Sequence, residues 1–164
     1  MLKAFLAVVG LLGVVACSSV DCALQKKVEC KVQMVDANGQ EVAFDGYLTV
    51  SIAEPTAETV KDTLLNRLDK VSSFSFPLSY AADVDILRLS FSNREENADV
   101  IDVLSIEKSN EPVFESVDCA PRFNHTISSV SCTSNIIDSV KINNKKVDND
   151  ASKVHLRIYM HTAD

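Results

Sequence analysis

Apolar and polar residues alternate along most of the chain beyond residue 27, and this period of two predicts half-buried β-strands. The clearest examples are residues 27–34, 47–52 and 154–160. Shorter strands are predicted at 74–78, 87–91, 113–117, 126–131 and 136–142. Residues 100–106 carry apolar groups on both faces, which is typical of a central strand covered on both sides.

One segment follows a different period. Val60, Leu64, Leu68 and Val71 recur at helical spacing, and Thr56 after Pro55 has the side chain of a helix N-cap. The spacing predicts one helix of about four turns, packed on a sheet.

Asn, Asp, Ser and Pro clusters separate the predicted strands, and residues 143–150 are predicted to form a solvated hairpin tip. Many short strands with a single helix favour two packed antiparallel sheets. We therefore expect a mainly β fold, an antiparallel β-sandwich with one short helix, which forms a single disulfide-bonded domain over residues 19–164.

The first 18 residues have the pattern of a secretory signal peptide, with Lys3, an apolar run over 4–16 and small residues after it. The run is too short for a stable membrane span, and a buried N-terminal helix or an uncleaved anchor are the alternatives. Residues 12–17 also resemble a bacterial lipobox, which would leave Cys17 acylated at the surface. Both export routes place the domain outside the cell, and secretion is the expectation.

Five cysteines are present, and four of them follow the predicted signal: Cys22, Cys30, Cys119 and Cys132. An even number in an exported chain predicts two disulfides. The short separations favour Cys119 with Cys132 and Cys22 with Cys30. The alternative joins the two N-terminal cysteines to the later pair.

The formal charge of −7 becomes −8 when Lys3 leaves with the signal. An acidic domain repels phosphate groups, so nucleic acid and anionic membranes are not expected as partners. The histidines are scattered and no CxxC motif occurs, so no metal site and no cofactor are predicted.

The last predicted strand carries the candidate binding residues. Val154, Leu156, Ile158 and Met160 are expected to point inward, and the outward face is the polar set His155, Arg157, Tyr159 and His161. His155 and His161 would stand roughly 20 Å apart, too far to share a metal ion. This set either lines a binding face or is the solvent face of a terminal strand.

Asn124-His125-Thr126 matches the N-glycosylation acceptor in a stretch expected to be a loop. No serine stands in a G-x-S-x-G context and no phosphate-binding loop is present, so no catalytic residue is predicted.

Five segments resemble the nematode transthyretin-like family of secreted proteins: 28–32, 62–65, 74–76, 87–91 and 154–158. The resemblance covers residues 27–92 and 153–162, and it implies a secreted β-sandwich. Ser73 stands where the family usually has Gly, and residues 109–150 have no clear counterpart. The enzymatic relative of transthyretin that hydrolyses 5-hydroxyisourate ends in Tyr-Arg-Gly-Ser, which is absent here, so that activity is not expected.

The sequence thus predicts a secreted, non-catalytic binding module, whose partner is a small apolar ligand or an extracellular protein such as a cell-surface receptor. The alternatives are a secreted hydrolase with His155 or His161 as base, and a surface lipoprotein acylated on Cys17.

Overall fold

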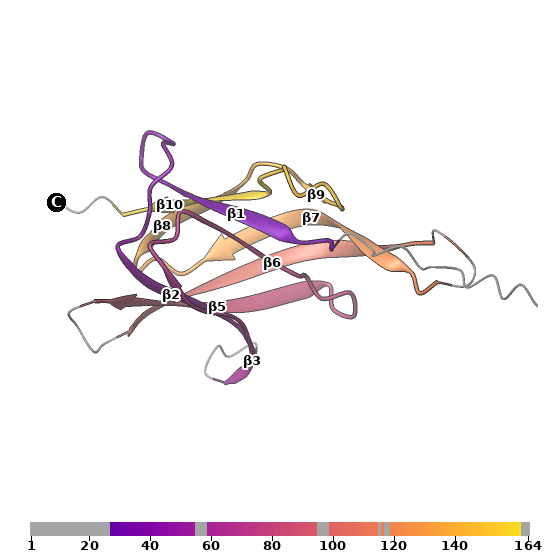
Figure 1. Cartoon of the computed structure of the whole chain (residues 1–164), viewed down its shortest axis with the longest axis horizontal. Coiled ribbons are helices and arrows are strands. Elements are labelled where there is room, and N and C mark those ends of the chain that lie inside the picture. The colour runs from indigo at the N-terminus through magenta and orange to yellow at the C-terminus, as the bar shows by residue number, and fades with distance from the viewer. Residues whose placement is uncertain (1–26, 55–58, 95–98, 115, 117–118, 162–164) are drawn as a thin grey trace, which may run out of the picture.

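The computed structural model describes residues 27–54, 59–94, 99–114, 116 and 119–161 (Figure 1). All the regular elements in these ranges are strands, and they follow one another as β1 (Cys30–Val35), β2 (Gly46–Ala53), β3 (Val60–Asp69), β4 (Ser73–Phe76), β5 (Val84–Asn93), β6 (Asp99–Val113), β7 (Arg122–Cys132), β8 (Ile137–Ile142), β9 (Lys146–Val147) and β10 (Leu156–Met160).

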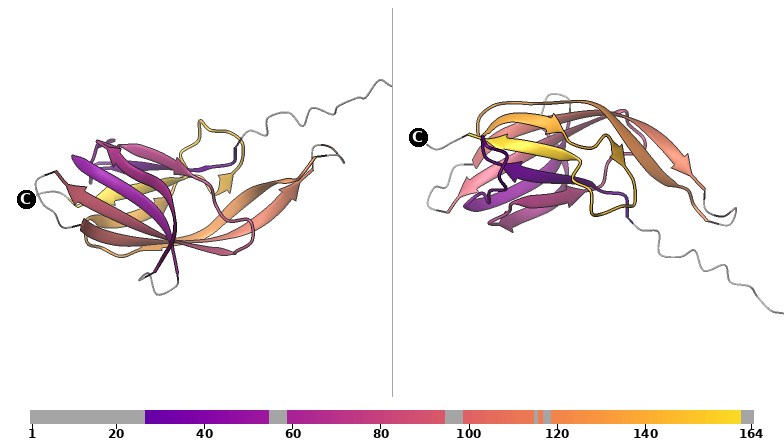
Figure 2. Two further views of the ribbon diagram at one scale, coloured as in Figure 1. Left: turned by 60° about the horizontal axis from the view of Figure 1, so that its bottom comes forward. Right: turned by 90° about the horizontal axis from the view of Figure 1, so that it is seen from above.

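The strands form two sheets that lie face to face (Figure 2). The four-stranded sheet has the order β4-β1-β10-β8, and the six-stranded sheet has the order β3-β2-β5-β6-β7-β9. Neighbours are antiparallel, except that β1 and β10 run parallel. The prediction of a mainly β, sandwich-like fold is confirmed.

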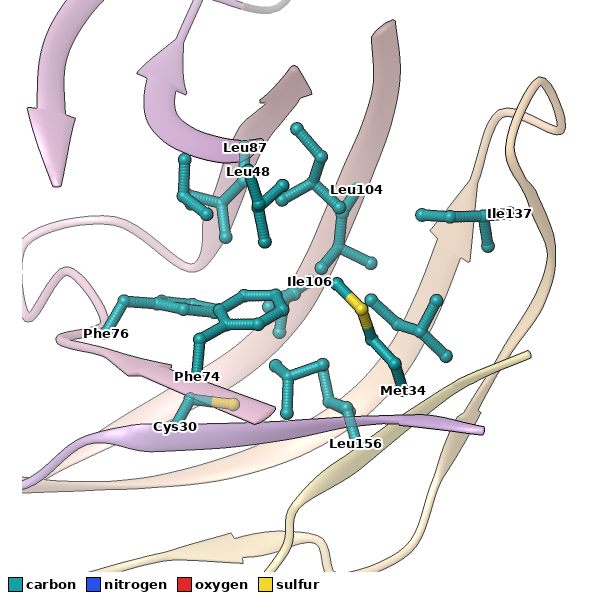
Figure 3. Packing of buried hydrophobic residues seen from close by; sticks show 14 of the residues in the cluster. Cys30, Met34, Leu48, Phe74, Phe76, Leu87, Leu104, Ile106, Ile137 and Leu156 are labelled. Carbon is teal, nitrogen blue, oxygen red and sulfur yellow. The ribbon is translucent and has the colours of Figure 1, made fainter. Parts of the chain in front are cut away.

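One hydrophobic core lies between the sheets (Figure 3). Met34 and Phe76 from the four-stranded sheet meet Leu48, Leu89 and Leu104 from the six-stranded sheet, and all five are fully buried. Burial of each such side chain contributes about 1.5–3 kcal/mol. All of them except Leu104 lie on the apolar faces that the alternation predicts.

The predicted helix is wrong. Residues 60–69 form the edge strand β3, and Thr56 lies outside the described residues. A step of four is a multiple of two, so Val60, Leu64 and Leu68 would share a face in a regular strand as well as in a helix. In β3 itself, three register shifts against β2 break this alternation. Left-handed φ angles of 49° and 47° at Arg67 and Lys70 interrupt the alternation near the strand end.

β6 is central in its sheet, but only one of its faces is covered. Asp102, Leu104, Ile106 and Lys108 point inward and are buried, whereas the alternate residues on the other face are half-buried at 101, 103 and 105 and exposed at 107. The inward row therefore has a charged residue at each end of an apolar middle. The sequence pattern did not predict these two buried charges, because the apolar residues of 100–106 fall on both faces of the alternation.

β6 and β7 continue beyond their neighbours as a projecting arm (Figure 2). Pairing with β5 ends at Glu107, whereas pairing with β7 continues to Val113 opposite Arg122. The register of β6 and β7 shifts after Glu107. This β-bulge lets both Val130 and Ile127 of β7, which are an odd number of residues apart, face the core.

The predicted disulfide pairs are also wrong, because Cys30 and Cys132 are free thiols. Cys119 is disulfide-bonded, and Cys22 lies outside the described residues. β7 occupies most of the chain between Cys119 and Cys132. An 11-residue strand spans roughly 34 Å, far beyond the Cα separation that a disulfide allows.

The segment predicted as a solvated tip is anchored at one point. Its residues Lys146 and Val147 form β9 against β7. Val147 is fully buried, while Lys145 and Asp150 are exposed as predicted. The connection from β8 to β10 thus reaches across to the six-stranded sheet and closes that side of the sandwich.

Candidate functional site

A cleft of about 540 Å³ lies where the arm leaves the sandwich. We call it the arm cleft. It is lined by the segment before β1, the β4–β5 connection and the start of β7, with residues Lys27, Val28, Leu78, Tyr80, Ala120, Pro121, Arg122, Phe123 and His125. The described lining is mostly apolar and aromatic, and its charged members are basic.

An aromatic pair stands at this cleft. The rings of Tyr80 and Phe123 stack with centroids 5.0 Å apart and planes inclined by 21°. Phe123 is half-buried, but Tyr80 is 66% exposed and keeps most of its surface in solvent. An exposed aromatic ring held in place by a partner is a rigid apolar surface on which a flat ligand can stack.

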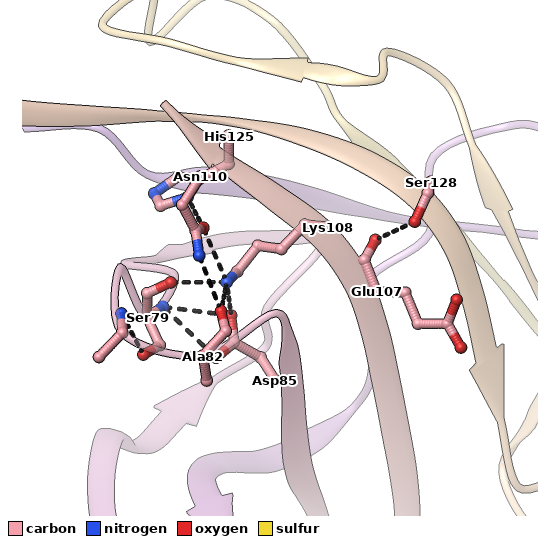
Figure 4. A network of polar contacts seen from close by, with 9 residues as sticks. Ser79, Ala82, Asp85, Glu107, Lys108, Asn110, His125 and Ser128 are labelled. Atoms are coloured by element: carbon pink, nitrogen blue, oxygen red, sulfur yellow. Dashed lines mark hydrogen bonds and ion pairs between the residues drawn. The ribbon is translucent and has the colours of Figure 1, made fainter. Parts of the chain in front are cut away.

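A buried lysine, Lys108, contacts Asn110, which in turn contacts His125 of the cleft lining (Figure 4). The Lys108 side chain is fully excluded from solvent, and its Nζ lies 3.4 Å from Oδ2 of Asp85. Nζ also donates to the carbonyl oxygens of Ser79 and Ala82, at 2.6 and 2.5 Å, and to Oδ1 of Asn110 at 3.1 Å. A buried ammonium is tolerated only with this kind of multiple partnering.

The titratable groups around Lys108 are shifted by burial and by its charge. Burial raises the pKa of Asp85, and the Lys108 ammonium works against that rise. Burial, helped by the positive charge of Lys108, lowers the pKa of His125 to about 4. The imidazole of His125 is therefore neutral at pH 7, and its Nδ1 lies 2.7 Å from Oδ1 of Asn110.

His125 and Asn110 face each other directly across β7 and β6. His125 lies on the inward face of β7 together with Ile127. Its ring lines the cleft and also contacts Asn110. We define the Lys108 cluster as Lys108, Asp85, Asn110 and His125 with the carbonyl groups of Ser79 and Ala82. It links the floor of the cleft to a charge pair between the sheets.

The structure does not bring all four residues predicted from the last strand together. His155 was expected to face outward, but it is fully buried, because the connection after β8 covers it and β10 lies between β1 and β8. Its Nδ1 accepts the backbone N–H of Lys31 at 2.9 Å. Burial lowers the pKa of His155, so this histidine serves the packing of the fold.

Arg157 and Tyr159 do lie on the outer face of the four-stranded sheet, half-buried. The ammonium group of Lys141 on β8 lies 4.5 Å from the centroid of the Tyr159 ring. This contact covers part of the ring with a neighbouring side chain.

His161 is exposed beside a second pocket of about 460 Å³ at the other end of β1. Val42, Phe44, Ile136 and Met160 supply most of its apolar lining. Tyr159 and His161 also line a third pocket of about 290 Å³ together, whereas the buried His155 lines neither this pocket nor the second one.

Asn124, predicted to carry glycan in a loop, lies instead within β7, half-buried and opposite Glu111 of β6. Its glycosylation stays a prediction. The only sequence signal at the neighbouring His125 is its place as the middle residue of that motif. Tyr80 and Lys108 carried no motif at all, and only the break that Lys108 makes in an apolar alternation could have drawn attention to it.

Within the described ranges no group of three or more His, Cys, Asp and Glu side chains is placed to hold a metal ion. In the same part of the chain, no helix has the length and apolar character needed to cross a membrane.

The fold and the cleft define a class, a two-sheet β-protein with an open, largely apolar cleft beside a projecting hairpin. Residues 48–160 match DUF6452, described as a family of unknown function, and the chain belongs to that family. No curated protein and no solved structure matches it. The resemblance to transthyretin-like proteins therefore stays a prediction.

Proposed function

We propose that the chain is an exported, non-catalytic binding module that holds a small, flat apolar ligand in the arm cleft. The observation that carries the proposal is the Tyr80–Phe123 stack over an open cleft, with Tyr80 66% exposed. Small-molecule sites commonly measure about 300–1,000 Å³ and combine an apolar lining with a few polar groups. The arm cleft, at about 540 Å³, has both properties.

Binding without catalysis is favoured over a hydrolase that uses His155 or His161 as base. His155 is fully buried. His161 Nε2 meets the Ser134 hydroxyl at 3.1 Å, which is the contact of a nucleophile with its base. However, the next backbone N–H groups, at 135 and 136, donate to Asp102 and are not free to stabilise an oxyanion.

Export is part of the proposal, and it is tested by the mass of the mature N-terminus. Cleavage near residue 18 supports secretion. A diacylglycerol on Cys17, which lies outside the described residues, would support the surface-lipoprotein alternative. Recovery of the chain with Met1 attached would contradict export.

The binding claim is tested on the oxidised mature chain with two flat probes, 2-naphthol and 2-methoxynaphthalene, titrated by isothermal calorimetry. At least one probe should bind with 1:1 stoichiometry. Tyr80→Ala removes the exposed stacking ring and should weaken binding about tenfold, the equivalent of roughly 1.4 kcal/mol. Since Tyr80 is largely exposed, this change should alter stability by less than about 0.5 kcal/mol.

Tyr159→Ala is the matched control, because it removes the same side chain from the outer face of the four-stranded sheet. It should leave probe affinity unchanged. If Tyr159→Ala weakens binding and Tyr80→Ala does not, the outward face of the last strand is the site. If neither probe binds, the arm cleft is not a small-molecule site.

A further inference from the structure

The orientation of the Asn110 amide follows from the chemistry of its neighbours. The Lys108 ammonium can only donate, so the amide atom 3.1 Å from it is the carbonyl oxygen Oδ1. The carbonyl oxygen of Ala82 can only accept, so the amide atom 2.9 Å from it is Nδ2. Both ends of the amide therefore require the same orientation.

This orientation determines which nitrogen of His125 carries the proton. Nδ1 lies 2.7 Å from Oδ1 of Asn110, an acceptor, so Nδ1 must donate a hydrogen. A neutral imidazole has one N–H, which leaves the lone pair on Nε2. The ring lines the arm cleft, so Nε2 is the nitrogen available to a ligand.

The orientation of Asn110 and His125 is stabilised by the contacts of Lys108. Lys108 is fixed by its contacts to Asp85 and to two carbonyl oxygens, and its position follows the β-bulge at which Ser128 Oγ donates to the Glu107 carbonyl at 3.1 Å (Figure 4). The positive charge that Lys108 places beside Asn110 also opposes protonation of His125. Hence the tautomer does not depend on a ligand.

We infer that His125 Nε2 is a fixed hydrogen-bond acceptor in the arm cleft, so that the cleft selects aromatic ligands that carry a hydroxyl or ring N–H. The inference rests on the proposed function, which supplies the stacking surface. A ligand whose ring lies on Tyr80 and whose edge donates to Nε2 satisfies both features. An equally flat ligand without a donor leaves the buried acceptor without a partner, which costs affinity.

The two probes named above test this selection, because 2-naphthol has the donor and 2-methoxynaphthalene carries a methyl group in its place. The wild type should bind the naphthol about tenfold more tightly. His125→Phe keeps a flat ring and removes Nε2, so it should bring the affinity for naphthol down to that for the ether. Equal binding of both probes by the wild type would overturn the inference while the proposed function stands. If the wild type binds neither probe, both the inference and the proposed function are wrong.

A second measurement reads the tautomer of His125 directly and does not depend on ligand binding. Long-range ¹H–¹⁵N correlation spectra of the wild type at pH 7 distinguish the two tautomers of each histidine. His125 should appear as the Nδ1–H form, with its signals assigned by their absence in His125→Phe. An Nε2–H form would overturn the inference, whatever the probe affinities.

Discussion

The carboxylate of Asp102 accepts the backbone N–H of Ile137 at 2.9 Å, across 35 positions of the chain. Asp102 belongs to β6 of one sheet and Ile137 begins β8 of the other. The same carboxylate accepts the N–H groups of Asn135 and Ile136 and the hydroxyl of Thr133, at 2.7–2.8 Å. One buried anion therefore holds the crossing between the two sheets.

Asp102→Ala should lower the free energy of unfolding by about 3 kcal/mol or more, since it leaves the backbone N–H groups of Asn135, Ile136 and Ile137 without their acceptor. Urea denaturation followed by circular dichroism measures the loss. Asp138→Ala is the control, because Asp138 is exposed on β8, and it should change stability by less than about 0.5 kcal/mol. Equal losses in the two variants would show that the Asp102 contacts add nothing.

Lys108→Met should lower the free energy of unfolding at pH 7 by about 3–5 kcal/mol, because it leaves Asp85 buried without its cation. Loss of that cation raises the pKa of Asp85 further above its unfolded value. Stability from a raised carboxyl pKa is present below the unfolded pKa and is lost as pH rises through the folded pKa. The difference between variant and wild type should therefore shrink from pH 7 to pH 4.5.

His125 contributes in the same direction, since removing Lys108 also removes a charge that lowers its pKa. The double variant Asp85→Asn/Lys108→Met separates the causes. It should recover much of the stability at pH 7 and lose most of the extra pH dependence. A single variant equally destabilised at both pH values would contradict an uncompensated Asp85.

Most strands could be predicted because flat sheet faces impose a period of two on the residues that bury. The helix could not be excluded, because spacings of four at Val60, Leu64 and Leu68 fit both periods. The disulfide between Cys119 and Cys132 could have been excluded, because residues 126–131 between them were themselves predicted to be extended. The bulge in β7 leaves only a faint signal, the odd spacing of Ile127 and Val130.

The candidate site was harder to predict from the sequence than the fold. Lys108 contacts Ser79 and Ala82 across 29 and 26 positions of the chain, and no local pattern encodes such a pairing. Tyr80 looked like one more loop residue. His155 belongs to the most regular polar alternation in the chain. That alternation correctly predicted a strand, but it could not predict that the connection after β8 covers His155 and buries it.

Cys30 and Cys132 should differ in their reaction with iodoacetamide. Burial and the nearby charge of Asp85 raise the pKa of Cys30 to about 12. The pKa of Cys132 is raised too, through burial and then Asp102, but this thiol is only half-buried. Because the thiolate is the reactive form and must also be reached, Cys132 should be labelled first.

Mass spectrometry of tryptic peptides from the folded, exported protein gives the order of labelling. Cys30 should stay protected until guanidinium unfolds the chain, after which both cysteines should react. If both cysteines resist labelling in guanidinium until a reductant is added, they form disulfides in the exported protein. That result would contradict the assignment of Cys30 and Cys132 as free thiols.

The affinity for 2-naphthol should be constant from pH 8 to about 5 and should fall by half near pH 4. Protonation of His125 removes the Nε2 lone pair, and its pKa is lowered to about 4 by burial and by Lys108. The charged and titratable groups that face His125 or share its cleft are Lys108 from β6, Asp85 from β5, Arg122 from β7, Lys27 before β1 and Tyr80. Of these, Asp85 also gains a proton in acid, so folding is checked by circular dichroism at each pH.

The affinity for 2-methoxynaphthalene, which needs no acceptor, should not change over the same pH range. A loss of naphthol binding centred near pH 6.5 would mean that His125 titrates as an ordinary solvent-exposed histidine, and that neither its burial nor Lys108 controls it.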